Sequence, residues 1–180
     1  DRDFSRSILL FSIFIEHVSL FSQFLIMLSF DKYEKQFKGV ANAVEATSKE
    51  EQIHGLFGIE LIDIIREEHP EWFGPEFEQT VQKACRRAYN AERKMLDWIF
   101  EEGELDFLPR PTVDAFLRDK LNRSLENVKV EPIFEVDDDL LGETRWFYEE
   151  ILLTKGNDFF SKRSTSYSKM TQSVSGDDLF

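Results

Sequence analysis

Residues 8–30 constrain the fold more than any other segment, because they are almost wholly apolar yet hold Glu16 and His17 near their centre. The segment is long enough to span a membrane. However, a charged residue at the bilayer centre costs about 2.5–3.5 kcal/mol, and no basic cluster flanks this one. We therefore interpret it as a helix buried within a bundle. A buried carboxylate requires a cation, hydrogen-bond donors or a metal, which makes Glu16 a candidate ligand.

Helical spacing returns after a polar connection at residues 31–39. Apolar residues three and four positions apart predict a second helix over residues 40–68, and Pro70 is its stop signal. Pro75 predicts the start of a third helix that ends at Gly103, and Pro111 begins a fourth that runs to residue 125. The chain has only 8 glycines and 5 prolines, which favours long helices over a β-rich fold. The fold class is therefore predicted to be all-α.

The last fifty residues differ in character. Residues 131–134 are expected to be extended, and a short amphipathic helix is predicted over residues 140–153. From residue 155 the sequence is rich in Ser, Thr, Lys and Asp, and residues 162–180 have too little apolar surface to offset the entropy lost on ordering. We therefore divide the chain into a helical part, residues 1–153, and a disordered C-terminal tail, residues 154–180. The tail ends in an apolar pair, which suggests a segment that folds on a partner.

Charge and cysteine content exclude several classes of function. Lys and Arg number 22 and Asp and Glu 35, so the net charge is −13. Such a chain is a poor candidate for binding nucleic acid or an anionic membrane surface. The single cysteine, Cys85, excludes an intramolecular disulfide and fits a reducing compartment such as the cytoplasm. The chain shows no signal peptide and does not begin with Met, so we interpret it as a fragment of a longer protein or one part of a split one.

The strongest chemical motif is Glu51-Gln52-Ile53-His54, a Glu-x-x-His sequence within the second predicted helix. Residues three apart share one helical face, so the carboxylate and the imidazole can converge on one point. Dimetal-carboxylate bundles use two such motifs together with one acidic residue from each of two other helices. This chain offers one motif and one further acid, Glu16, which is half of that ligand set.

Other readings of these residues stay open at this stage. A Glu-x-x-His motif arises often by chance, and a surface Glu beside a packed His is its ordinary explanation. His17 follows Glu16 directly and so points about 100° away around the helix. His69 lies at a predicted helix end, and Cys85 lies on an apolar stripe where packing is its expected role.

Several longer motifs, taken in order, resemble the radical-generating small subunit of class I ribonucleotide reductase. The resemblance extends over essentially the whole chain. The segments that carry it are residues 15–24 (IEHVSLFSQF), 44–55 (VEATSKEEQIHG), 103–108 (GELDFL), 131–134 (EPIF), 162–169 (KRSTSYSK) and 177–180 (DDLF).

The resemblance implies a ferritin-like helical bundle, of which this chain is the second half, around a dinuclear metal centre. Glu16, Glu51 and His54 match metal ligands of that half, for iron in the first place, with manganese or a mixed manganese–iron pair as alternatives. Glu50 stands where the family commonly has Asp, an acid that links the metal site to the radical route. Tyr167 matches the tail tyrosine that passes the radical between subunits.

The activity implied is that of ribonucleoside-diphosphate reductase, an oxidoreductase that makes deoxyribonucleotides for DNA replication, with this chain as part of one subunit. The implied partners are the catalytic large subunit, bound through the C-terminal tail, the missing N-terminal half, and a second copy in a homodimer. Two other classes stay open: a ferritin-like dimetal oxidase or metal-storage protein, and a non-catalytic adaptor whose ligands are relics. The ferritin-like class would not need a tail with an isolated Tyr167 and a terminal Leu179-Phe180 pair. The adaptor would bind a partner through its tail, and metal analysis of the complete assembly would distinguish it.

Overall fold

The computed structural model describes residues 2–153, and every regular element within them is a helix. The all-α prediction is therefore confirmed for this part of the chain. The elements, in order, are α1 (Arg2–Phe11), the π-helix η1 (Ser12–Ser19), α2 (Phe21–Glu34), α3 (Lys38–Glu68), the 3₁₀ turn η2 (Pro70–Trp72), α4 (Pro75–Ile99), α5 (Arg110–Asn127), α6 (Asp138–Gly142) and the π-helix η3 (Phe147–Leu152).

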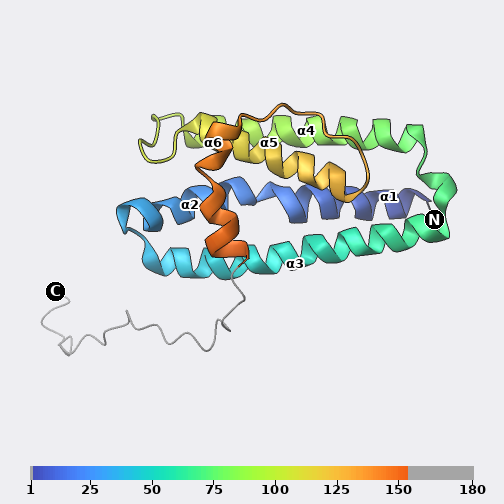
Figure 1. The fold of residues 1–180 in the computed structure, drawn as a ribbon, viewed down its shortest axis with the longest axis horizontal. Helices are drawn as coiled ribbons and strands as arrows, with labels where there is room; N and C mark the ends of the chain where they lie inside the picture. Colours follow the sequence, from blue (N-terminus) through green and yellow to red (C-terminus); the bar gives the residue numbers. More distant parts are fainter. Residues whose placement is uncertain (1, 154–180) are drawn as a thin grey trace, which may run out of the picture.

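One long rod, formed by α1, η1 and α2, lies along the centre of the bundle (Figure 1). The longest single helix, α3, runs back antiparallel along one side of this rod. On the other side α5 packs against η1 and α2, and α4 packs against α5. The segment that holds α6 and η3 crosses the rod from α5 to α3. The rod is therefore contacted from both sides, which explains its apolar sequence.

Two predicted boundaries are wrong. The connection expected at residues 31–39 shrinks to residues 35–37, because Tyr33 packs its ring 6.0 Å from that of Phe107 and keeps the last turn of α2 helical. The single helix expected over residues 140–153 is two short helices with a break between them. At the break, the buried Thr144 donates its hydroxyl hydrogen bond to the Leu141 carbonyl oxygen at 2.8 Å. Local packing and side-chain hydrogen bonds overrode the spacing of apolar residues in both places.

The core is built around an aromatic cluster that joins the central rod to its neighbours. Phe21, Phe116 and Phe147 are fully buried, and the ring of Phe147 lies edge-on to both of the others, at 6.2 and 5.3 Å between centroids. Cys85 is also buried, as expected for a packing residue, and burial raises the pKa of its thiol to about 12.

The continuous helix Arg2–Glu34 is long and apolar enough to cross a membrane if length and composition alone are considered. In the structure, 56% of its most apolar window is buried against the rest of the bundle. Phe14, Phe21 and Phe24 point into the core, whereas Phe11 is exposed. This extent of burial is typical of the core helix of a bundle.

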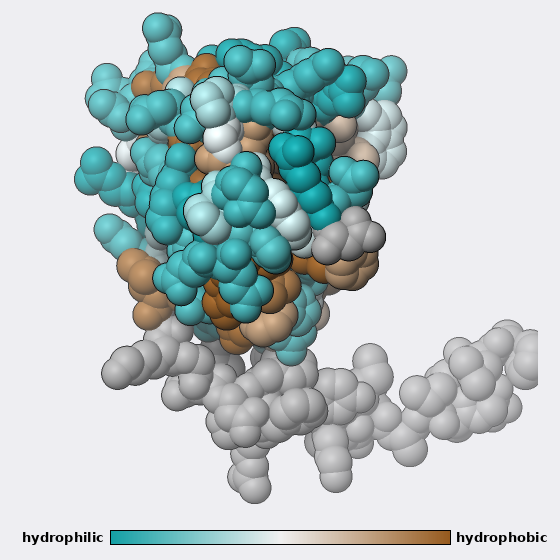
Figure 2. All heavy atoms as spheres, turned by 90° about the vertical axis from the view of Figure 1, so that its right-hand side faces the viewer, coloured by the Kyte–Doolittle hydropathy of each residue, from teal (hydrophilic) through white to brown (hydrophobic). Residues whose placement is uncertain are grey.

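An apolar face on α3 has no cover from any of residues 2–153. Ile53, Phe57 and Ile64 belong to the apolar spacing that predicted this helix, yet their exposed fractions are 65%, 71% and 46%. Figure 2 shows hydrophobic atoms gathered at the lower edge of the molecule, where α3 lies, beneath a mostly hydrophilic upper part. Large apolar side chains concentrated on one face are typical of an interaction surface.

Candidate metal site

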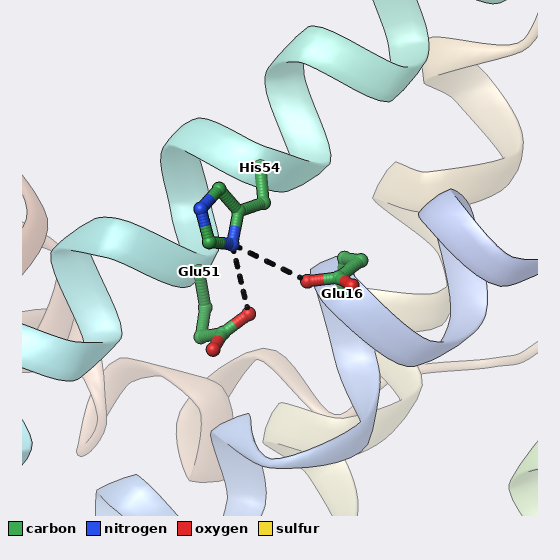
Figure 3. Close-up of side chains that lie close together, drawn as sticks. All are labelled: Glu16, Glu51 and His54. Carbon is green, nitrogen blue, oxygen red and sulfur yellow. Dashed lines mark ion pairs between the residues drawn. The ribbon is translucent and has the colours of Figure 1, made fainter.

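Glu16, Glu51 and His54 converge on one point between η1 and α3 (Figure 3). The Nδ1 atom of His54 lies 3.5 Å from a carboxylate oxygen of Glu16 and 3.5 Å from one of Glu51. One potential ligand atom from each residue lies within 4.8 Å of the other two. The sequence expectation that these three side chains meet in space is borne out by this geometry.

Two glycines on α3 allow η1 to approach closely enough for this convergence. Gly55 and Gly58 follow Glu51 at four and seven positions, so they share its helical face. A Cβ atom at Gly55 would lie 3.0 Å from the Cβ of His17, and one at Gly58 would lie 2.3 Å from the Cβ and Oγ of Ser12. Because glycine has no side chain at these two positions, the backbone of η1, and Glu16 with it, lies next to the face of α3 that holds Glu51.

A carboxylate on α4 fixes the junction between η1 and α2. Glu92 accepts hydrogen bonds from Ser19 Oγ at 2.8 Å, from Gln23 Nε2 at 3.1 Å and from Ser22 Oγ at 3.5 Å. Single π-helical turns interrupt the regular helical register and often occur at functional sites. Glu92 thus anchors the end of the π-helix that presents Glu16.

The electrostatics of the cluster favour a bound cation. The pKa of Glu16 is raised above its ordinary value, first by its hydrogen bond with Glu51, then by burial and by the negative charge of Glu51. His54 opposes this shift through its charge and its own hydrogen bond. Two carboxylates this close repel each other when both are ionised, and a metal cation would relieve that repulsion.

The donor set also fits a metal in its chemistry and spacing. Carboxylate oxygens with one imidazole nitrogen suit iron or manganese. Two atoms that are each about 2.1 Å from one ion can be at most about 4.2 Å apart, and the two Nδ1–oxygen separations of 3.5 Å fall within that limit. The side chain of His54 is 60% exposed, whereas those of Glu16 and Glu51 are each 22% exposed. The cluster is therefore open on the His54 side.

The other residues singled out in the sequence lie apart from this cluster. Glu50 is exposed on α3, one position before Glu51. His17 turns away, as expected, and its Nδ1 lies 2.7 Å from Ser124 Oγ on α5. His69 is the residue that ends α3, and its ring stacks on Trp72. Tyr167 and the terminal residues 177–180 lie outside the residues that the structure describes.

Sequence reasoning missed a buried lysine. Lys120 is only 2% exposed and lines a cavity with His17. Its position could have revealed it, because it lies at helical spacing from Phe116, Leu117 and Ser124, all of which are buried. A charged residue on the apolar stripe of a helix is the signal that was overlooked.

Comparison with known proteins agrees with the site. The family described as ribonucleotide reductase, small chain, matches residues 1–140. The ribonucleoside-diphosphate reductase subunit beta of Chlamydia pneumoniae is 27% identical over 164 residues, 91% of this chain and 46% of that protein. A protein of Invertebrate iridescent virus 3, named as a probable ribonucleoside-diphosphate reductase small subunit, is 27% identical over 177 residues, 98% of this chain and 46% of its own.

The chain thus spans 46% of the length of each of these two relatives. The family match covers the central rod, α3, α4 and α5, and so includes all three residues of the cluster. On this match the chain belongs to the ribonucleotide reductase small-chain family.

Proposed function

We propose that this chain supplies the second half of the dinuclear metal centre of a class I ribonucleotide reductase small subunit. The observation that carries this proposal is the Glu16–Glu51–His54 cluster, which holds half of the ligand set of a dimetal-carboxylate bundle. The other half would be a further acidic residue and a further Glu-x-x-His motif. The match to less than half of each relative agrees with a second half supplied by other residues.

The exposed apolar face of α3 supports the same proposal. Ile53 and Phe57 flank His54 in sequence and are exposed, as is Ile15, which precedes Glu16. Helices that bring the remaining ligands would cover these side chains and remove His54 from solvent. Burying a large aliphatic or aromatic side chain stabilises an assembly by about 1.5–3 kcal/mol. The packing of these helices against α3 would thus complete the metal site and bury the apolar face together.

In the proposed mechanism, this chain's own residues bind the metals. Glu16, Glu51 and the Nδ1 atom of His54 would hold the ions, and the metal centre would supply the oxidising power when bound. His54 is 60% exposed, and the helices that complete the bundle would shield it and its two neighbours from solvent. A completed bundle would therefore provide placement and a dry environment for the oxidant.

The route of the radical is the finer part of the proposal. Glu50, on the same helix as two of the ligands, would exchange a proton as the oxidising equivalent moves. Tyr167 would then lose its phenolic proton and an electron together, and so pass the oxidation to the large subunit. The tail, residues 154–180, would dock on that subunit, where ribonucleotides are reduced. The assembly would be a cytoplasmic homodimer of completed small subunits.

The test is to purify the native assembly and measure three quantities. Intact mass would show whether other residues accompany this chain, and elemental analysis would count iron and manganese. Ribonucleoside diphosphate reduction would be assayed with and without the large subunit. We expect a companion segment, two metal ions for each completed bundle, and activity only with the large subunit. An assembly that binds no metal and supports no reduction would contradict the proposal.

A further inference from the structure

A cavity of about 520 Å³ opens between α5 and the segment that holds η3. Its buried lining includes His17 and Lys120, and its exposed lining includes Arg123 and Arg145. The three ligand residues of the metal site do not line it. The cavity is therefore a separate feature, and the proposed metal chemistry gives it no role.

Lys120 is the unusual member of this lining. Lys120 is 2% exposed, and its ammonium makes neither a hydrogen bond nor an ion pair with any side chain among residues 2–153. Its Nζ atom lies 3.8 Å from the centroid of the Phe21 ring and 5.8 Å from that of Tyr148. The rings attract the ammonium by cation–π interaction, but they do not supply the oxygen or nitrogen acceptors that its three N–H donors need. The ammonium therefore has to find its acceptors in the cavity that it lines, either water or the oxygens of an anion.

Lys120 lies among charged side chains of both signs, and the side chain of Asp119 is 13% exposed whereas that of Arg123 is 52% exposed. The pKa of Lys120 is lowered to about 7, mainly by burial and in smaller part by the charge of Arg123, while Asp119 opposes the shift. Asp119 is itself engaged, since it accepts a hydrogen bond from Arg123 Nε at 2.7 Å and another from Tyr148 at 3.3 Å.

The acidic side chains that line the cavity are Glu126 on α5 and Glu149 on η3, and both are exposed. The bond from Arg123 to Asp119 uses Nε and leaves the two terminal amino groups of Arg123 able to donate. Lys120 is therefore the buried cation of this lining, while the arginine donors and the two carboxylates all lie on its exposed part.

We propose that this cavity binds a small oxyanion of the phosphate class, with Lys120 as its buried anchor. Its oxygens would accept from the Lys120 ammonium, and Arg123 and Arg145 would close on it from the mouth. Arginine and lysine are the residues that proteins use for such groups. The ligand could be a free ion or the phosphate group of an ester, since both present the same oxygens. This site does not depend on the metal centre, so its failure would leave the proposed function untouched.

The test is calorimetric titration of the full chain, in its native assembly, with sulfate at constant ionic strength. Sulfate serves as the probe because its charge does not change between about pH 6 and pH 8.5. Lys120→Met removes the charge and keeps the aliphatic stem, Lys120→Arg keeps the charge, and Lys83→Met is the matched control at an exposed lysine on α4. Circular dichroism would establish that each variant folds.

We expect sulfate affinity to fall at least about tenfold in Lys120→Met, to persist in Lys120→Arg and to stay unchanged in Lys83→Met. Between pH 6 and pH 8.5 the affinity of the unaltered chain should also fall about tenfold or more, because Lys120 loses its proton. No binding, equal binding by Lys120→Met, or affinity independent of pH would overturn the proposal. Equal binding would mean an adventitious ion only.

Competition separates the two sources of the ligand. Inorganic phosphate and phenyl phosphate would each be titrated against bound sulfate. Displacement by inorganic phosphate alone would assign the cavity to a free oxyanion, and displacement by both would assign it to the phosphate group of an ester as well. Displacement by neither would exclude the phosphate class and overturn the proposal.

Discussion

Gly58 of α3 lies against Ser12 of η1 so closely that a Cβ atom added at Gly58 would be 2.3 Å from the Ser12 Cβ. Ser12 begins the π-helix that presents Glu16, and Gly58 lies one helical turn after His54. The spacing between these two backbones therefore sets how closely Glu16 on η1 approaches Glu51 and His54 on α3.

Gly58→Ala should separate η1 from α3 and weaken metal binding. The clash involves a Cβ atom, which moves only with its backbone, so we expect a loss of about 1–3 kcal/mol in the free energy of unfolding. Thermal unfolding and metal titration of the native assembly measure the two effects. Gly39→Ala, near the start of the same helix, meets nothing within 4 Å and should be neutral or slightly stabilising. Equal behaviour of the two variants would contradict this role for Gly58.

Glu51→Ala should abolish metal loading at its position while the bundle stays folded. The packing energy comes from apolar side chains, and removing Glu51 takes away both the hydrogen bond and the repulsion through which it raises the pKa of Glu16. Metal content and helical circular dichroism of the native assembly check the two halves of this prediction. Glu60→Ala removes an exposed carboxylate from the same helix and serves as the control. Normal metal content in Glu51→Ala would exclude this residue as a ligand.

Lys120→Met should stabilise the chain at pH 6 and lose that advantage as the pH rises. The folded pKa of Lys120 is about 7, below the ordinary value of 10.5, so below pH 7 the folded state bears the full penalty of a buried charge. Between the two pKa values the unfolded chain binds more protons here, and the free energy of unfolding of the unaltered chain therefore rises with pH. At about 1.4 kcal/mol per pKa unit, the difference between the variants should change by several kcal/mol.

Denaturant unfolding at pH 6, 8 and 9.5 measures this difference, and other titrating groups cancel in the comparison of the two proteins. A difference that does not vary with pH would mean that Lys120 titrates normally in the folded chain.

Tyr167→Phe should abolish ribonucleotide reduction while leaving subunit association unchanged. Phenylalanine keeps the ring and its packing but has no phenolic proton to lose. Turnover with the large subunit and an affinity measurement by surface plasmon resonance test the two parts separately. Normal turnover would show that Tyr167 is not on the radical route, and weakened association would assign it to docking instead.

Deleting residues 177–180 should weaken binding to the large subunit and leave the metal content unchanged. Leu179 and Phe180 would act as the apolar anchors of a short docking segment, each contributing about 1.5–3 kcal/mol. Because each 1.4 kcal/mol is about a factor of ten in affinity, the loss should be one to several orders of magnitude. Unchanged affinity would place the docking surface elsewhere on the chain.

The sequence alone predicted the four long helical segments and the candidate ligand residues. The spacing of apolar residues indicated the central rod, α3, α4 and α5. Helical periodicity is a local property, so it can be recognised in a segment before the elements packed against it are known. The same holds for Glu51 and His54, whose common face follows from their separation of three residues. The apolar segment around Glu16 made it a candidate as a buried carboxylate, although nothing local placed it beside Glu51 and His54.

The tertiary structure decided which residues of different helices meet and which helix faces are exposed, because the spacing of residues along one helix contains neither. Gly55 and Gly58 act through the close approach of another helix, and Lys120 became notable only when its ammonium was buried beside the ring of Phe21. Apolar spacing predicted that Ile53 and Phe57 would form a helix, but not that they would be exposed. A periodic pattern gives the direction in which side chains point along a helix. Which of those faces is covered depends on the elements that pack against it, and that is a property of the folded assembly.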